Sequence, residues 1–482
     1  MLQVYAELFP ELHSQGVTYC HWKSNSHLEA GLSGDTDLDL LVREGQKEEF
    51  KEVLIRHDFK RVISPPPKHY PGIEHYLGFD FGTGKIVHLH VYYRLILGQR
   101  YFKNYHLPIE TFILNDLRLV KGVFVPSVEV ELFLLLIRAS MKLGLGDILK
   151  YLLGQSKMPF PKGLLEEFGW LLKGYEKHKF SNVLQKSGLP LSRVRLIAFV
   201  EGLEQGRLAL TEILGIRRHI FKALCPFRRY PFFGAFKRAS FIRLHSAAIL
   251  KHFLQASKKR LDGHGKSIAF VGADGSGKST LADDIGKWLS PKLEVQTFYF
   301  GIPKTLGLSF LNKIAEGLRL LSQPGDGKTS IPFLESIRNT LVSFKWVCVA
   351  RKRLNIFYEF QKVAETGGVA IGDRYPLVDF WNMDVPMDGP RIRKEGGNGN
   401  RKWAEREEQL YSLFGSPTKV FVLKASIGEL RKRRSNLNPT SHHMKVKAVN
   451  SIEESHRICA IDANRPYNEI LIDLKRDIWE LL

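Results

Sequence analysis

Three patterns of apolar and polar residues follow one another along this 482-residue chain. Residues 1–125 contain short apolar runs, such as YLGFDF and IVHLHVYY, between turn residues, which predicts a small α/β domain. In residues 126–262 apolar residues recur at helical spacing, as in VEVELFLLLIRASMKL, which predicts a helical connector. In residues 263–482 β-rich runs (SIAFVG, GVAIGD, KVFVLK) alternate with helical patterns, which predicts a doubly wound α/β domain with a parallel sheet.

Composition adds a prediction about partners. Hydrophobic residues make up 44% of the chain, which excludes a largely disordered protein. The 71 Lys and Arg residues against 50 Asp and Glu give a net charge of +21, which suits polyanions, anionic lipid surfaces and phosphorylated small molecules alike. The four cysteines are widely scattered, and no basic, apolar signal segment opens the chain, so we expect a soluble, cytoplasmic protein with reduced thiols.

The strongest motif is a candidate phosphate-binding loop. The segment GADGSGKS fits the pattern G-x-x-x-x-G-K-[ST], with an apolar run before it and a helical pattern from Thr280 to Leu289 after it. Glycines allow successive backbone N–H groups to face a phosphate, and the following helix N-terminus adds its positive dipole. The predicted ATP-binding residues are Gly272, Ala273, Asp274, Gly275, Ser276, Gly277, Lys278, Ser279 and Thr280.

A Mg²⁺ site and a basic lid are predicted around this loop. Ser279 is expected to supply a hydroxyl to Mg²⁺, and Asp373, at the end of the apolar run GVAIG, is placed to hold the metal or its water. Lys278 is expected to reach the β- and γ-phosphates. Arg431 and Arg434 belong to a basic helix that either closes over the γ-phosphate or faces solvent.

Four segments in this order, GADGSGKST, GDRY, the basic helix and AIDANRPYNEI, resemble thymidylate kinase and related nucleoside-monophosphate kinases over residues 265–482. The resemblance implies a P-loop kinase fold in which Asp274 faces the acceptor sugar. It also implies that Asp373 and Arg374 lie between the metal, the phosphates and the acceptor. Arg351 or Arg353 would be the arginine that binds the acceptor.

The acceptor motifs depart from that family. Its Arg-Glu-Pro-Gly type motif is replaced by FYFGIPK, where Lys304 is the nearby cation, and its thymine-recognising residues by PLVDFWNMDVPMDGP. The insertion RIRKEGGNGNRKW is either an acceptor lid or a surface loop. The acceptor is therefore predicted to be a nucleoside monophosphate such as dTMP or, alternatively, a sugar or sugar phosphate.

A second candidate site lies near the N-terminus. Asp37 and Asp39 are two residues apart on a short apolar run, so in a strand both carboxylates share a face, as two-metal chemistry requires. The stretch resembles the nucleotidyltransferase superfamily related to polymerase β, with Lys23 and Ser24 where that family has its Gly-Ser turn. No third carboxylate is evident on a later strand, where His88 and His90 stand instead. A working transferase, an inactive relative and a plain polar strand all remain open.

A basic, aromatic segment lies in the connector. Residues 217–260 carry Arg and Lys interleaved with Phe and Tyr, and contain no acidic residue. Three interpretations remain open: binding of single-stranded nucleic acid, docking on an anionic membrane, and packing of the aromatics against neighbouring domains. The sequence thus predicts an ATP- and Mg²⁺-dependent phosphotransferase, and the transferase-like N-terminal stretch suggests a bifunctional enzyme. The alternative, from another class of function, is an ATP-binding switch that docks on membrane or nucleic acid.

Overall fold

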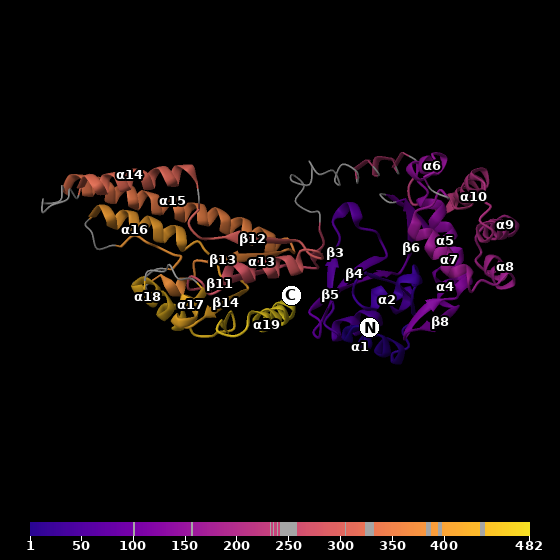
Figure 1. Ribbon diagram of the computed structural model, residues 1–482, viewed down its shortest axis with the longest axis horizontal. Coiled ribbons are helices and arrows are strands. Elements are labelled where there is room, and N and C mark those ends of the chain that lie inside the picture. Colours follow the sequence, from indigo (N-terminus) through magenta and orange to yellow (C-terminus); the bar gives the residue numbers. More distant parts are fainter. Residues whose placement is uncertain are drawn as a thin grey trace. The chain divides into compact units, whose positions relative to one another are not determined.

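The computed structural model describes residues 1–99, 102–155, 158–231, 233–234, 236–238, 240–241, 258–303, 305–322, 332–381, 387–393, 398–433 and 439–482. The chain forms two compact units, an N-terminal unit of Met1–Lys259 and a C-terminal unit of Arg260–Leu482 (Figure 1). The segment that the sequence analysis separates as a connector, 126–262, belongs to the N-terminal unit as far as Lys259.

A mixed sheet forms the first half of the N-terminal unit. Its strands are β1 (Tyr19–His21), β2 (Leu38–Val42), β3 (Lys60–Ile63), β4 (Ile73–Asp80) and β5 (Lys85–Tyr92), which lie in the order β1-β2-β5-β4-β3. Strands β2 and β5 are parallel, and the other neighbours are antiparallel. The parallel register sets Asp39 opposite His90. The apolar runs YLGFDF and IVHLHVYY are thus strands of one sheet, and a separate domain over residues 1–125 stays a prediction.

Short elements complete this half of the unit. They are the helices α1 (Gln3–Ser14), α2 (Leu28–Leu32), α3 (Lys47–Arg56) and α4 (Glu110–Leu114), and the hairpins β6 (Leu95–Gln99) with β7 (Phe102–Leu107) and β8 (Leu117–Val120) with β9 (Val123–Pro126). The 3₁₀ turns of this half are η1 (Asn25–His27), η2 (Glu44–Gln46) and η3 (Pro66–Lys68), and a fourth, η4 (Cys225–Phe227), belongs to the second half.

Helix α5 (Val128–Lys142) is the centre of the second half. Ser127 caps its N-terminus by accepting a hydrogen bond from the Val130 N–H. The helix is apolar around most of its circumference, and such a helix is stable only when it is buried. It is covered by α7 (Lys162–Leu172), α8 (Lys177–Lys186) and α10 (Leu210–Ala223), with α6 (Leu145–Leu152) and α9 (Arg193–Glu204) further out. One hydrophobic core joins these helices to Trp22 and Tyr92 near the sheet, so they are not an independent domain.

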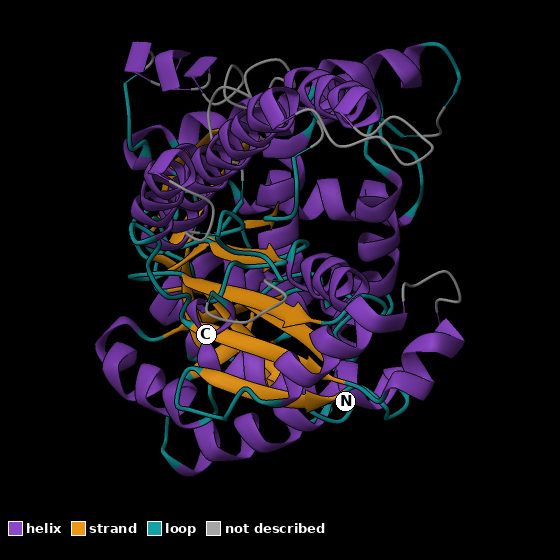
Figure 2. Cartoon of the chain, turned by 90° about the vertical axis from the view of Figure 1, so that its left-hand side faces the viewer, coloured by secondary structure: helices purple, strands orange, loops and turns teal. Residues whose placement is uncertain are grey.

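The C-terminal unit is built on a parallel sheet. Its strands are β11 (Lys266–Gly272), β12 (Val295–Tyr299), β13 (Val369–Asp373), β14 (Lys419–Lys424) and β15 (Ile458–Asp462), in the order β12-β13-β11-β14-β15. Strands are drawn in orange and helices in purple in Figure 2. Every neighbouring pair is parallel, which confirms the parallel sheet that the sequence predicts. A two-residue strand, β10 (Arg260–Leu261), precedes it.

Helices cover both faces of this sheet. They are α13 (Lys278–Leu289), α14 (Leu306–Ser322), α15 (Pro332–Glu365), α16 (Asn398–Tyr411), α17 (Ile427–Arg433), α18 (Pro439–Asn450) and α19 (Tyr467–Leu481), with the 3₁₀ turn η5 (Val378–Phe380). Gly286 of α13 faces Ile371, whereas Phe360 of α15 faces the next residue, Gly372. Because successive strand residues point to opposite faces, α13 and α15 pack on opposite sides of β13, as in a doubly wound fold. Among the described residues, none of the helices is both long enough and apolar enough to cross a bilayer.

Candidate active site

The phosphate-binding loop connects the end of β11 to the start of α13, as predicted. Gly275 and Gly277 have φ angles of +87° and +97°, a conformation that glycine adopts without strain. A Cβ on Gly272 would lie 2.9 Å from the Leu423 carbonyl oxygen on the neighbouring strand β14. Glycine is therefore needed here for backbone conformation at two positions and for close packing at the third. The first N–H groups of α13 have no partner within the helix and are available to an anion.

Lys278 is folded back onto this loop. Its ammonium donates a 2.7 Å hydrogen bond to the Ala273 carbonyl oxygen, and the residue is only 5% exposed. Burial, together with repulsion from Arg374, lowers the pKa of Lys278 to about 8. A charged group held this way gains strongly from a bound phosphate, because the phosphate compensates a charge that the protein only partly balances.

Ser279 and Asp373 meet although 94 positions separate them in the chain. The Ser279 hydroxyl donates a 2.6 Å hydrogen bond to Asp373 Oδ2. The parallel register of β11 and β13, which sets Phe270 opposite Asp373, brings the strand end beside the loop. The other carboxylate oxygen, Asp373 Oδ1, is buried and has no hydrogen-bond partner among the described residues. A hydroxyl and an unsatisfied carboxylate oxygen are ligands that suit Mg²⁺, so this pair fits the predicted metal.

Asp274, inside the loop, is held by two cations. Its carboxylate accepts hydrogen bonds from Arg374 at 2.7 Å and from Lys445 at 2.8 Å. Burial alone would raise the pKa of Asp274, but Lys445 and Arg374 outweigh it and hold the pKa well below its usual value. Arg374 itself has a positive φ of 63°, which is uncommon for a residue with a side chain. His442 also contacts the loop, with its Nε2 3.0 Å from the Asp274 carbonyl oxygen. Helix α18 therefore packs on the phosphate loop, a contact that the sequence analysis missed.

Of the two arginines proposed on α15, the structure brings Arg353 to the site and leaves Arg351 exposed. Arg353 is fully buried and donates hydrogen bonds to the Tyr411 hydroxyl (2.7 Å) and Asp388 Oδ1 (3.0 Å). The other oxygen of Asp388 lies 3.8 Å from Arg374 Nη1. A continuous chain of charged groups thus links Arg353 to the phosphate loop.

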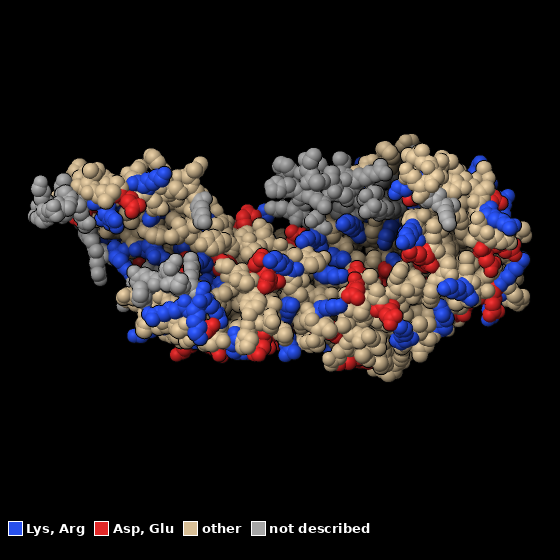
Figure 3. Space-filling view, in the orientation of Figure 1, with Lys and Arg blue, Asp and Glu red and all other residues tan. Residues whose placement is uncertain are grey.

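The predicted lid is described only in part. Arg431 lies on α17 and is exposed, while Arg434 and Lys304 lie outside the described residues. Arg433, one residue before Arg434, instead donates a hydrogen bond to the Ala463 carbonyl oxygen at 2.9 Å. On the face drawn in Figure 3, Lys and Arg side chains gather over the part of the C-terminal unit where Figure 1 labels α17. The role of Arg431 in closing over a phosphate stays a prediction.

In the N-terminal unit, Asp37 and Asp39 are already paired. Asp39 lies 2.7 Å from Lys23 Nζ and 3.2 Å from His90 Nδ1, and Asp37 lies 2.6 Å from His88 Nδ1. His90 occupies the position on β5 opposite Asp39. Within the described ranges, no group of three or more His, Cys, Asp or Glu side chains is arranged to hold a metal ion. The nucleotidyltransferase site therefore stays a prediction that rests on the sequence.

The basic, aromatic segment is described up to residue 241, with gaps, and again from residue 258. Its central part packs on strand β7. The Arg229 N–H donates to the Asn104 carbonyl oxygen at 2.7 Å, and the Asn104 side chain bonds both the N–H and the carbonyl of Tyr230. For these residues, packing within the N-terminal unit is what the structure shows. Binding of membrane or nucleic acid by this segment stays a prediction.

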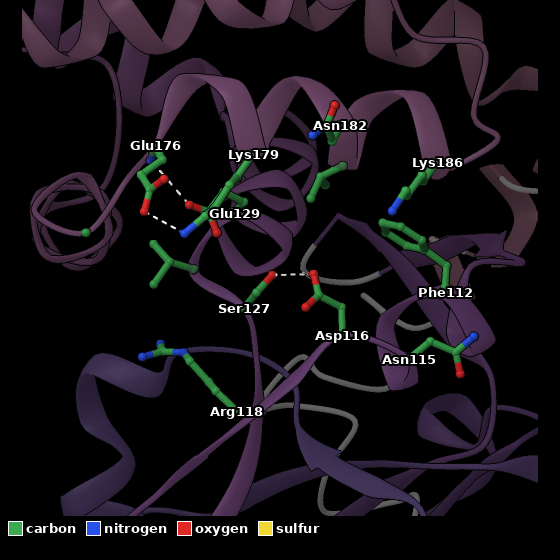
Figure 4. A pocket seen from close by; sticks show the side chains of 13 residues that line it. Phe112, Asn115, Asp116, Arg118, Ser127, Glu129, Glu176, Lys179, Asn182 and Lys186 are labelled. Atoms are coloured by element: carbon green, nitrogen blue, oxygen red, sulfur yellow. Dashed lines mark hydrogen bonds and ion pairs between the residues drawn. The ribbon is translucent and has the colours of Figure 1, made fainter.

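A cavity of about 710 Å³ lies in the N-terminal unit, beside helices α5 and α8 (Figure 4). Several of its polar side chains stabilise the starts of these helices. The Ser127 hydroxyl donates to Asp116 at 2.7 Å, Glu129 accepts from the Glu176 N–H at 3.2 Å, and Lys179 donates to Glu176 at 2.6 Å (Figure 4). These groups therefore have a structural role around the cavity.

Comparisons with known proteins give distant similarities. No protein-family model matches the chain. The uncharacterized ATP-binding protein YghR of Escherichia coli K12 is 25% identical over 215 residues, which cover 42% of this chain and 83% of YghR. The uncharacterized ATP-binding protein YghS of the same organism is 28% identical over 228 residues, or 42% of this chain and 88% of YghS.

Two solved structures also share similarity with the chain. Thymidylate kinase from Candida albicans is 18% identical with a TM-score of 0.27, over 46% of this chain and 92% of the kinase. Deoxyadenosine kinase from M. mycoides is 12% identical with a TM-score of 0.29, over 44% of this chain and 98% of that kinase. At these TM-scores the likeness carries no argument about function, which must come from the site itself.

Proposed function

We propose that the C-terminal unit is an ATP- and Mg²⁺-dependent phosphotransferase. The observation that carries this proposal is the pairing of Ser279 with Asp373 beside the loop that contains Lys278. A phosphate loop, a buried lysine whose charge the protein only partly balances, and a hydroxyl–carboxylate pair are the parts that phosphoryl transfer requires. The similarity to two proteins named as ATP-binding supports the choice of nucleotide.

Each residue has a separate task in this proposal. Lys278 leaves the Ala273 carbonyl and binds the β- and γ-phosphates, while the N-terminus of α13 binds the phosphate oxygens. Ser279 and Asp373 would hold Mg²⁺, which would neutralise charge on the phosphate oxygens. The acceptor oxygen attacks the γ-phosphorus, the bond to the bridging oxygen of ADP breaks, and the proton of an acceptor hydroxyl passes to the carboxylate of Asp274 or Asp388 beside Arg374. Arg374 stabilises the charge on the transferred group.

Two classes of phosphoryl acceptor are considered, one from the sequence resemblance and one from the contacts of Arg353. A nucleoside monophosphate such as dTMP is the acceptor that the sequence resemblance implies. The pairing of Arg353 favours a second class, the hydroxyl of a sugar or sugar phosphate. Its guanidinium is already bonded to Asp388 and Tyr411, so binding an acceptor phosphate would require these contacts to break. Asp274 and Asp388 also provide carboxylates near the site that suit a hydroxyl donor.

The proposal is tested by incubating the full chain with ATP and Mg²⁺ and a panel of nucleoside monophosphates, nucleosides, sugars and sugar phosphates, and by measuring products by mass. Lys278→Ala removes the phosphate-binding cation, and Lys287→Ala is the matched control because Lys287 is an exposed lysine on the same helix. We expect product with the wild type and Lys287→Ala, and none with Lys278→Ala. ADP that forms at the same rate with every acceptor and without one would instead indicate an ATP-binding switch.

A further inference from the structure

A second, smaller cavity lies in the N-terminal unit, where β5, β6, β7 and α5 come together. Its volume is about 90 Å³. This is room for a small polyatomic anion, since a single water needs only about 10–15 Å³ of such space. Trp22, Tyr92 and Leu97 form apolar parts of its wall and are buried. Its charged lining consists of four cations: Lys23, Lys103, Arg138 and Lys142.

Two of these four cations are balanced by carboxylates. Lys23 lies 2.7 Å from Asp39, and Arg138 lies 3.0 Å from Glu167. In the part of the chain that the structure describes, neither Lys103 nor Lys142 forms an ion pair. Four positive and two negative charges leave the lining with an excess charge of +2.

The excess charge is buried beside aromatic rings. Lys103 Nζ lies 5.1 Å from the ring centre of Tyr70 and 5.5 Å from that of Tyr92, and these cation–π contacts compensate only part of the cost of its burial. Burial, with repulsion from Lys23, lowers the pKa of Lys103 to about 8. Burial also lowers the pKa of Lys142, and Arg138 and Lys23 add to this effect. An anion in the cavity would relieve this repulsion, and the apolar walls would strengthen its attraction to the cations.

We propose that this cavity binds the phosphate group of a small phosphorylated molecule and that it does so without a metal ion. A phosphate monoester carries up to two negative charges, which matches the excess of +2, whereas a single carboxylate would leave one cation unbalanced. Arginine and lysine are the side chains that most often bind phosphate in proteins. Asp39 lies beside Lys23 and His90, where its negative charge offsets that of Lys23.

The first experiment measures binding of inorganic phosphate to the full chain by calorimetry. The chain carries Lys278→Ala to weaken the phosphate loop, and EDTA removes divalent metal. We expect saturable binding that Lys103→Gln weakens about tenfold or more, because a charge-assisted hydrogen bond is lost. Lys162→Gln is the matched control, since Lys162 is a lysine that is 92% exposed in the same unit. Equal binding by Lys103→Gln and Lys162→Gln would overturn the proposal.

Asp39→Asn should change the affinity for phosphate in the opposite direction to Lys103→Gln. It removes a negative charge next to the bound phosphate, so we expect tighter binding in EDTA. A site that held phosphate through a metal on Asp39 would lose binding instead, and it would need Mg²⁺; either result would overturn the proposal. Far-ultraviolet circular dichroism of each variant checks that the N-terminal unit is folded.

The source of the phosphate is distinguished by a sedimentation assay with vesicles that contain phosphatidic acid. Free phosphate binding without sedimentation supports a soluble ligand. Sedimentation that Lys103→Gln abolishes and Lys162→Gln leaves intact supports a phosphate carried by a lipid. If the chain neither binds inorganic phosphate nor sediments with the vesicles, the proposed site is refuted. Because Lys103 belongs to the N-terminal unit, the result is independent of kinase activity in the C-terminal unit.

Discussion

The buried charge of Lys278 should make the nucleotide-free C-terminal unit less stable than it would be with a neutral side chain. The pKa of Lys278 falls from 10.5 to about 8. At about 1.4 kcal/mol per pH unit, this drop corresponds to a cost of roughly 3 kcal/mol while the side chain is charged. Lys278→Met keeps the apolar part of the side chain and removes the charge, but also loses the hydrogen bond to Ala273, worth about 1 kcal/mol. We therefore expect a net stabilisation of about 2 kcal/mol.

The effect has a defined pH dependence. Below pH 8, Lys278 is charged in both the folded and the unfolded chain, and the full cost is present. Between pH 8 and 10.5 the unfolded chain binds more protons at this group than the folded one, so wild-type stability rises with pH. The advantage of Lys278→Met should therefore disappear as the pH approaches 10.5.

Scanning calorimetry of the nucleotide-free protein measures this difference. The relevant transition is the one that ATP with Mg²⁺ shifts upward in the wild type, since a ligand stabilises the unit that binds it. About 2 kcal/mol should raise its midpoint by roughly 4–8 °C at pH 7 in a unit of this size. Lys287→Met, which changes an exposed lysine on the same helix, controls for the loss of a positive charge. A Lys278→Met midpoint at or below that of the wild type at pH 7, or a difference that does not change with pH, would refute the reasoning.

Three further predictions concern the same unit. Asp373→Asn should lower the turnover number about 100-fold or more in a coupled ADP assay, because it weakens the metal site, and an unchanged rate would remove Asp373 from the proposal. Arg353→Met should lower the free energy of unfolding by about 3–5 kcal/mol in denaturant titrations, since it removes the hydrogen-bonded partner of the buried carboxylate of Asp388, whereas Arg351→Met on the exposed side of α15 should change it little. Lys445→Gln should cost about 1 kcal/mol in the same measurement, because it breaks the partly exposed ion pair with Asp274.

The sequence by itself determined the local parts of this protein. The phosphate loop could be predicted because its residues are consecutive and its glycines take φ angles that other residues avoid. The parallel sheet followed from apolar runs that alternate with helical patterns. Asp373 could be placed because it ends a strand, and the ends of parallel strands lie at one edge of the sheet.

Only the tertiary structure decided which distant residues meet. Arg351 and Arg353 are equivalent in the sequence, but helix packing buries one and exposes the other. Lys445 reaches Asp274 across 171 positions, and no local pattern marks that contact. The four cations of the small cavity likewise come from three parts of the chain: Lys23 follows β1, Lys103 lies on β7, and Arg138 and Lys142 lie on α5. Such contacts depend on strand order and on how each helix is rotated against the sheet, which hydrophobic periodicity alone does not specify.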